Sequence, residues 1–143
     1  MRDVSLGCGQ INEKISSFAN CSLEEADEIK LSRQSDKVSD EDLKGIVSTV
    51  VTDWCSEIKR ALDFFYSSYP DDQIKRIILS GGGANIIEFR KLLAEETATA
   101  VEIINPFENF SVENRSLDDS YLEQIAPQAA ICMGIAIRKM GDK

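Results

Sequence analysis

The stretch IKRIILSGGGANI at residues 74–86 is the part of the sequence that decides the fold. Its first half is rich in aliphatic and β-branched residues, which predicts a strand buried on both faces. Glycines occupy positions 81–83, and a helix is predicted from about residue 86 to residue 96. Because glycine has no Cβ and reaches positive φ freely, such a turn lets a flat ring or a phosphate approach the main chain and meet helix N-terminal amides.

The glycine turn is not one of the common nucleotide fingerprints. No GK[ST] follows it, as a P-loop requires, and its spacing is not the GxGxxG of dinucleotide-binding folds. From the residues alone, the turn is compatible with a ligand and with close packing of the strand on the helix alike.

Periodic apolar residues predict three helices ahead of this unit. The longest runs from Ser39, which caps it, to Pro70, which ends it, with apolar residues at every third or fourth position. Trp54 keeps this period and is therefore predicted to lie in the core. A short amphipathic helix is predicted at residues 11–19, and another begins at the capping box SLEE, residues 22–25.

Turns and short apolar runs make up the rest of the chain. Residues 1–10 are predicted to end a strand and enter a turn, and residues 33–38 form a polar linker. A second strand is predicted at residues 100–104, followed by an irregular stretch at residues 107–120. A final helix is predicted to start near Pro127, and its apolar body AAICMGIAI is predicted to be buried.

These elements predict an α/β protein that is rich in helix and has a small sheet. Residues 1–70 are predicted to form a mainly helical subdomain with an N-terminal strand remnant. Residues 71–143 are predicted to form an α/β subdomain that carries the strand, the glycine turn and the helix after it.

The composition excludes several classes of function. The 143 residues carry 25 acidic and 16 basic side chains, a net charge of -9 that disfavours nucleic acid and anionic membranes as partners. The absence of histidine excludes Cys/His zinc sites and histidine-based triads. The four cysteines have no CxxC spacing and are predicted to be reduced thiols. With no signal peptide at its start and no bilayer-long apolar stretch, the chain is predicted to be soluble and cytoplasmic.

Several blocks of the sequence resemble the PilM family of actin-like type IV pilus assembly proteins, which is related to FtsA and MreB. The blocks follow the family's order over nearly the whole chain: RDVSLGCGQI, CSLEEADEIK, EIKRALDFFYSSYPDDQIKRIILSGGGANI, INPFENF and IAPQAAICMGIAIRKM. The resemblance implies the second half of an actin-like, ribonuclease H-like ATPase fold. Residues 1–70 would then be its IIB-like subdomain and residues 71–143 its IIA-like subdomain.

The resemblance also implies an adenosine-binding site. In actin-like proteins the adenosine lies between the glycine turn and a helix with the pattern A-E-x-x-K, whose acid takes ribose hydroxyls and whose lysine lies by the base. Without the resemblance, the matching pair on this chain would be read as a solvated i,i+3 ion pair. The positions that match are Ala26, Asp27 and Lys30 on the helix, and Gly81, Gly82, Gly83 and Ala84 in the turn.

Two positions depart from the family's pattern. Asp27 stands where the pattern usually has Glu, so its carboxylate extends one methylene less, and Glu88 replaces the later glycine of GGGAxxxGF. The implied cofactor is ATP, with Mg in a full-length protein, or no cofactor in this chain. An actin-like ATPase needs two phosphate-binding hairpins with D-x-G cores, and no D-x-G occurs here. The chain is therefore expected to be the C-terminal part of a longer protein and to have no catalytic residue and no metal site of its own. The full-length protein is expected to be at most a weak ATPase.

The resemblance further implies a scaffold that is peripheral to the inner membrane through its partners. Those partners are the pilus inner-membrane protein PilN and the pilus motor ATPases. Two alternatives stay open from the sequence. The chain could be half of an enzyme with the same superfold, such as a sugar kinase or a heat-shock chaperone ATPase, or a free-standing, degenerate nucleotide-binding module.

Overall fold

The computed structural model describes residues 3–32, 36–108 and 118–139. The chain divides into two compact units, Met1–Gln73 and Ile74–Lys143, which we call unit 1 and unit 2 and describe separately. The sequence placed the subdomain boundary between residues 70 and 71. Three sequence predictions fall partly outside the described residues: the start of the N-terminal strand, the linker at 33–35 and the irregular stretch at 109–117.

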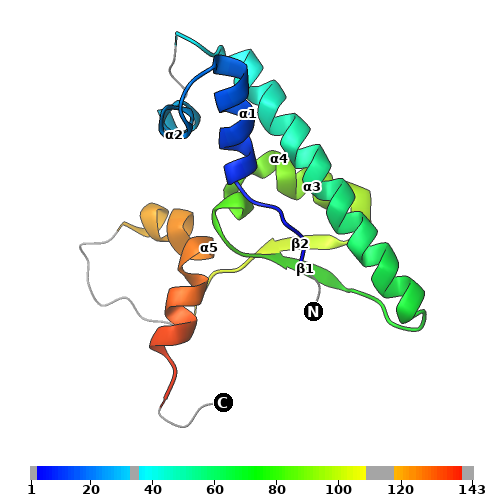
Figure 1. Cartoon of the computed structure of the whole chain (residues 1–143). Coiled ribbons are helices and arrows are strands. Elements are labelled where there is room, and N and C mark those ends of the chain that lie inside the picture. Colours follow the sequence, from blue (N-terminus) through cyan, green and yellow to red (C-terminus); the bar gives the residue numbers. More distant parts are fainter. Residues whose placement is uncertain (1–2, 33–35, 109–117, 140–143) are drawn as a thin grey trace. The chain divides into compact units, whose positions relative to one another are not determined.

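Unit 1 consists of three helices, α1 (Gly9–Ala19), α2 (Leu23–Ser32) and α3 (Asp40–Ser68). Helix α1 packs against both α2 and α3 (Figure 1). Trp54 is 3% exposed, as its position in the apolar stripe predicted, and its Nε1 donates to Gln10 Oε1 of α1 at 2.5 Å. The buried apolar side chains of unit 1 are Ile11, Ile15, Ala26, Ile29, Val38, Leu43, Val50, Val51, Trp54 and Cys55.

Both predicted helix caps of unit 1 are confirmed. The Ser22 backbone N–H donates to Glu25 Oε2, and the Glu25 N–H donates to Ser22 Oγ, each at 3.1 Å. This is the reciprocal pair of a capping box. At the start of α3, Ser39 Oγ accepts from the Asp42 N–H at 3.1 Å. Three acidic residues in the first turn of α3 add a favourable interaction with the helix dipole.

Replacing Ser39 with alanine is expected to lower the free energy of unfolding by about 1 kcal/mol, because one N-terminal amide of α3 loses its acceptor. Urea denaturation followed by circular dichroism measures the change. Ser56→Ala, at an exposed position inside the same helix, is the matched control and is expected to cost nothing. Coincident denaturation midpoints for the two variants would show that the Ser39 cap does not stabilise α3.

The predicted N-terminal strand is wrong for the residues that the structure describes. Residues 3–7 have no regular structure, and α1 already begins at Gly9. A strand exists only where its backbone amides and carbonyls pair with a neighbouring strand, and the described residues offer no such partner to this segment. The Ser5 carbonyl instead accepts from the Gln10 side-chain amide at 3.2 Å.

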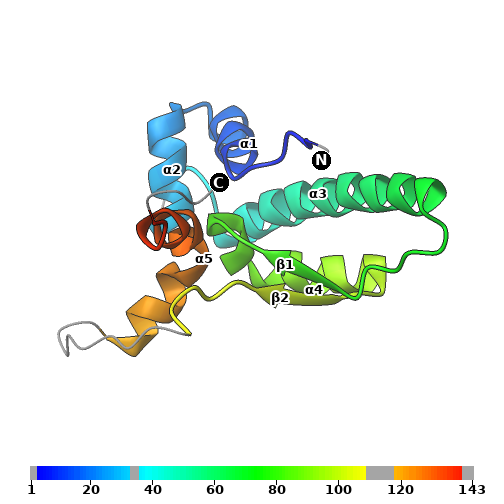
Figure 2. The ribbon, with the colours of Figure 1, turned by 90° about the horizontal axis from the view of Figure 1, so that it is seen from below.

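Unit 2 is a small α/β unit. It contains β1 (Arg76–Leu79), the short 3₁₀ turn η1 (Gly82–Asn85), α4 (Ile87–Thr97), β2 (Ala100–Ile103) and α5 (Asp119–Ala136). The two strands are parallel, with Ile77 opposite Val101, and α4 connects them and lies along one side of the strands (Figure 2). The buried side chains of unit 2 are Ala84, Phe89, Leu93, Ala126 and Pro127.

Two burial predictions in unit 2 are wrong. Strand β1 alternates between exposed and half-buried residues, and Ile78 is 51% exposed, where burial on both faces was predicted. The apolar second half of α5 was predicted to be buried, yet Ile131 and Ile135 are 73% and 65% exposed. Apolar side chains favour burial, but they become buried only where another helix or strand packs on them. Among the described residues, none packs on these side chains.

The predicted start of the last helix is also wrong. Helix α5 begins at Asp119, and Pro127 lies inside it instead of at its first position. The Asp118 carboxylate caps the helix by accepting from the Ser120 N–H, a signal that the sequence contained. A proline inside a helix removes one hydrogen bond and crowds the preceding turn, which bends the helix. Helix α5 changes direction along its length in both views (Figures 1 and 2).

Candidate functional site

The glycine turn of unit 2 is anchored to α5. The Gly81 N–H donates to the Pro127 carbonyl at 2.7 Å, and Ser80 Oγ donates to the same oxygen at 3.1 Å. A third contact joins Asn85 Nδ2 to the Gln124 carbonyl at 2.9 Å. Both of the first two contacts end on the carbonyl oxygen of Pro127, which lies inside α5. The turn is therefore a fixed feature of unit 2.

Gly81 and Gly82 serve the turn in different ways. Gly81 has φ of 89° and ψ of 173°, a conformation that residues with a Cβ rarely adopt. Gly82 has an ordinary φ and lies at the surface, and a Cβ built on it would meet only the Gln128 side chain, at 3.7 Å. The fold therefore requires glycine at position 81, whereas glycine at position 82 leaves bare main chain at the surface.

One detail of the predicted turn is wrong. The sequence predicted that the amides of the following helix point at a ligand in the turn. Instead η1 intervenes, α4 begins only at Ile87, and the Gly81 amide is already bonded to Pro127. Ala84 is buried at 2% exposure and packs inside the unit. The surface that remains for a ligand is the main chain around Gly82.

The predicted pair of unit 1, Asp27 and Lys30, is in direct contact on α2. Lys30 Nζ lies 2.6 Å from Asp27 Oδ1. A residue of α1 that the sequence interpretation missed completes the group: Asn12 Nδ2 donates to Asp27 Oδ1 at 2.9 Å, and Asn12 Oδ1 accepts from Lys30 Nζ at 2.8 Å. Asn12 follows the buried Ile11 and is itself half-buried. A polar residue beside the apolar face of an amphipathic helix is the signal by which the sequence could have pointed to Asn12. We call Asn12, Asp27 and Lys30 the polar triad.

The polar triad holds Asp27 in its charged form. The hydrogen bond from Lys30, the hydrogen bond from Asn12 and the charge of Lys30 all lower the pKa of Asp27. Because its pKa is lower in the folded protein, Asp27 contributes stability at pH values above its unfolded pKa of about 3.9. That contribution is lost as the pH falls through the lowered, folded pKa.

The hydrogen-bonding capacity of the triad is only partly used. Asp27 Oδ1 accepts both hydrogen bonds, whereas Asp27 Oδ2 accepts none from the described residues. Lys30 Nζ donates twice and has three N–H groups. The side chains of Asp27 and Lys30 are 47% and 23% exposed, so both are accessible from solvent. The triad thus presents a free carboxylate oxygen and a free ammonium N–H.

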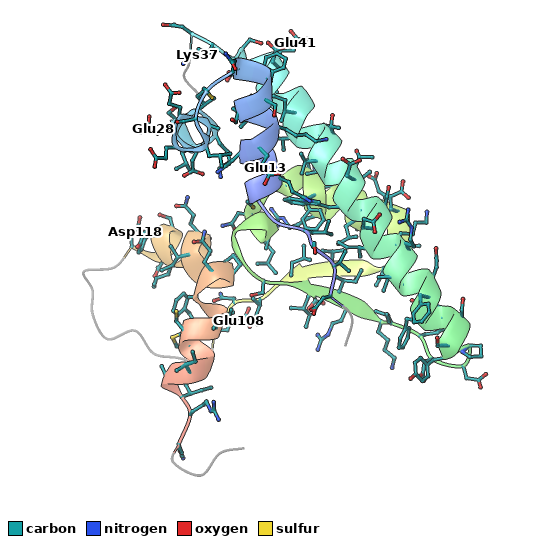
Figure 3. All side chains as sticks on the ribbon, viewed as in Figure 1. Glu13, Glu28, Lys37, Glu41, Glu108 and Asp118 are labelled. Atoms are coloured by element: carbon teal, nitrogen blue, oxygen red, sulfur yellow. The ribbon has the colours of Figure 1, made fainter. Side chains whose placement is uncertain are left out.

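A surface hollow of unit 1 lies elsewhere on α2 and the residues after it. Its volume is about 710 Å³, and its charged lining residues are Glu25, Glu28, Asp36 and Lys37. Figure 3 shows Glu28 and Lys37 at this part of the surface. Lys37 is paired with Glu25 at 3.4 Å, so the hollow is acidic overall and unsuited to a phosphate group. We therefore keep two candidate features, the polar triad in unit 1 and the glycine turn in unit 2.

The comparison with protein families identifies the chain. The family model described as type IV pilus assembly protein PilM matches residues 1–140. The chain belongs to the PilM family. This confirms the resemblance drawn from the sequence blocks, including the block around the glycine turn.

A solved structure gives the same fold. It is described as a PilM-PilN type IV pilus biogenesis complex, and one of its chains matches with a TM-score of 0.79 at 24% sequence identity. The match covers 96% of this chain and 38% of that chain, so this chain spans well under half the length of its PilM-family neighbour. The predicted fold class, part of an actin-like α/β fold with many helices and a small sheet, is confirmed.

Other site predictions have simpler outcomes. Among the described residues, no cluster of three potential metal-binding side chains exists, and no helix has the length and apolarity to cross a membrane. None of the four cysteines forms a disulfide; Cys55 is buried, Cys8 and Cys21 are half-buried and Cys132 is exposed. Glu88, the residue that departs from the glycine of the family pattern, lies exposed in the first turn of α4.

Proposed function

We propose that this PilM-family chain carries the adenosine-binding residues of a type IV pilus assembly scaffold and has no catalytic activity of its own. The observation that carries the proposal is the polar triad, in which a charged, accessible Asp27 keeps one oxygen free beside a lysine N–H. Ribose offers two adjacent hydroxyl donors, which suit a free carboxylate oxygen, and the purine ring offers nitrogen acceptors for the lysine.

The residues take separate roles in this proposal. Asp27 Oδ2 accepts from the ribose hydroxyls, and Lys30 donates to the purine. The main chain of Gly81–Ala84 lies against the adenosine, and Gly82 supports this role because its surface is bare and its neighbour Gln128 is a flexible side chain. Membership of the PilM family supports the assignment, since Asp27, Lys30 and Gly81–Ala84 resemble the adenosine motif of that family.

The chain's residues suit adenosine but not the phosphates. The phosphates and Mg of ATP need backbone amides and an aspartate of the D-x-G type, and the sequence contains no D-x-G. Among the described residues, no three carboxylate, histidine or cysteine side chains lie close enough together to hold a metal. We therefore assign neither phosphate binding nor hydrolysis to these residues. The bound nucleotide acts as a structural ligand of the scaffold.

Membership of the PilM family supports the proposal of a scaffold role in a cytoplasmic setting. The structural neighbour was solved as a PilM-PilN complex, and we propose a PilN-type inner-membrane protein as the partner and the pilus motor ATPases as the machinery served. Membership of the PilM family favours this role over a sugar kinase or chaperone ATPase. The degenerate nucleotide-binding module remains the alternative, and it differs from the proposal in lacking the pilus partners, not in its affinity for ATP.

Isothermal titration of ATP into the protein tests the adenosine assignment. We expect a dissociation constant below about 1 mM, which corresponds to more than about 4 kcal/mol of binding free energy. Adenosine alone is expected to retain most of that affinity, because the assigned contacts are to ribose and base. Binding of ATP weaker than millimolar would refute the adenosine assignment and leave the scaffold role without a nucleotide.

A further inference from the structure

We propose that Asn12 is a positioning residue of the adenosine site, whose carboxamide fixes Asp27 and Lys30 in the arrangement that receives the nucleoside. The inference rests on the proposed adenosine binding and goes beyond it. Asn12 lies outside the A-E-x-x-K helix and is not one of the residues that resemble the adenosine motif. It lies on α1, whereas the two residues that it joins lie on α2.

The geometry shows a closed ring of three hydrogen bonds. Asn12 Nδ2 to Asp27 Oδ1 measures 2.9 Å, Lys30 Nζ to Asn12 Oδ1 measures 2.8 Å, and Lys30 Nζ to Asp27 Oδ1 measures 2.6 Å. Each side chain of the ring contacts both others. A carboxamide is suited to this place because it donates to a carboxylate with one atom and accepts from an ammonium with the other.

Asn12 also decides which carboxylate oxygen stays available. An exposed i,i+3 pair holds its two long side chains loosely, and its direct attraction is weak. With Asn12 and Lys30 both bonded to Oδ1, the rotation of the carboxylate is restricted and Oδ2 accepts no hydrogen bond from the described residues. Without the amide, the carboxylate can turn and use Oδ2 on the lysine. Fixing the side chains before binding reduces the entropy that the nucleotide must overcome.

The neighbouring packing makes Asn12 a rigid support. Ile11 and Ile15 of α1 are 2% and 0% exposed, and Ala26 and Ile29 of α2 are 0% and 7% exposed. Helices α1 and α2 pack on each other, and buried Ile11 and Ala26 are the chain neighbours of Asn12 and Asp27. Because this packing holds the two helices together, Asn12 stays within reach of Asp27 and Lys30.

Asn12→Leu and Asn12→Asp test the inference in the intact protein. Leucine matches the size of asparagine and removes both hydrogen bonds, and aspartate keeps the acceptor for Lys30 but repels Asp27. We expect ATP affinity to fall roughly tenfold in Asn12→Leu, because without both hydrogen bonds the nucleotide must itself order the side chains of Asp27 and Lys30. Asn12→Asp is expected to lose at least as much. Ser17→Ala, at an exposed position on the same helix, is the control and keeps wild-type affinity.

The second readout is the pKa of Asp27, followed by carboxyl carbon NMR in each protein. Loss of the Asn12 hydrogen bond is expected to raise this pKa toward its ordinary value, and the repulsion in Asn12→Asp to raise it further. A wild-type protein that does not bind ATP would overturn the proposed function and, with it, this inference. ATP binding in the wild type with unchanged affinity in Asn12→Leu would overturn the inference alone. So would weakened binding with an unchanged Asp27 pKa, because Asn12 would then not act through Asp27.

Discussion

Valine in place of Gly82 is expected to abolish ATP binding while leaving the protein folded. Gly82 has an ordinary φ, is exposed, and has only the Gln128 side chain near the position of an added Cβ, at 3.7 Å. A branched side chain there covers the bare main chain against which we place the adenosine. The expected loss of affinity is at least a hundredfold, which corresponds to about 2.8 kcal/mol at 1.4 kcal/mol for each factor of ten.

Calorimetric titration of ATP measures the Gly82→Val effect, and circular dichroism with thermal melting checks the fold. Gly45→Val is the matched control, because Gly45 lies on α3 and a Cβ added to it would have open space around it. Gly45 is also not among the residues that we assign to adenosine binding. It is expected to bind ATP like the wild type. Unchanged ATP affinity in folded Gly82→Val would remove the glycine turn from the adenosine site.

Alanine in place of Leu93 is expected to destabilise the protein by about 2–5 kcal/mol, the usual cost of deleting a buried leucine side chain. Leu93 is 0% exposed and lies on α4, the helix that connects the two parallel strands of unit 2. Because the free energy of unfolding of a whole domain is only about 5–15 kcal/mol, this loss is a large fraction of the stability of unit 2.

Urea denaturation followed by circular dichroism measures the Leu93→Ala effect. Leu31→Ala makes the same chemical change at a position that is 74% exposed, and its cost is expected to stay within about 0.5 kcal/mol. Equal denaturation midpoints for the two alanine variants would contradict the packing of α4 described here.

Local signals in the sequence predicted local structure well. The capping box at Ser22 and the cap at Ser39 are confirmed because each involves residues only three positions apart, and chain connectivity alone brings them together. The positive φ of Gly81, which a glycine turn allows, has a similarly local origin. In each case a short pattern decides the conformation.

Features that depend on distant parts of the chain were predicted less well. Pro127 is compatible with a helix start and with a helix interior, and the observed bounds of α5, Asp119–Ala136, show that the second occurs. The exposure of Ile78 and Ile131 depends on which helices or strands pack on them. A run of apolar residues does not show which these are. Asn12 joins the triad through the packing of α1 on α2, a contact across 15 positions to Asp27.

The most direct test of the adenosine assignment is an NMR titration of the protein with ATP, followed through its assigned backbone amides. We predict that the shifted signals fall in two groups, Ala26–Lys30 of α2 and Gly81–Ala84 of the glycine turn, with Asn12 beside the first. Adenosine should shift the same signals. An ATP titration that leaves both groups unmoved, or that shifts only the signals of Asp36 and Lys37 at the acidic hollow, would contradict it.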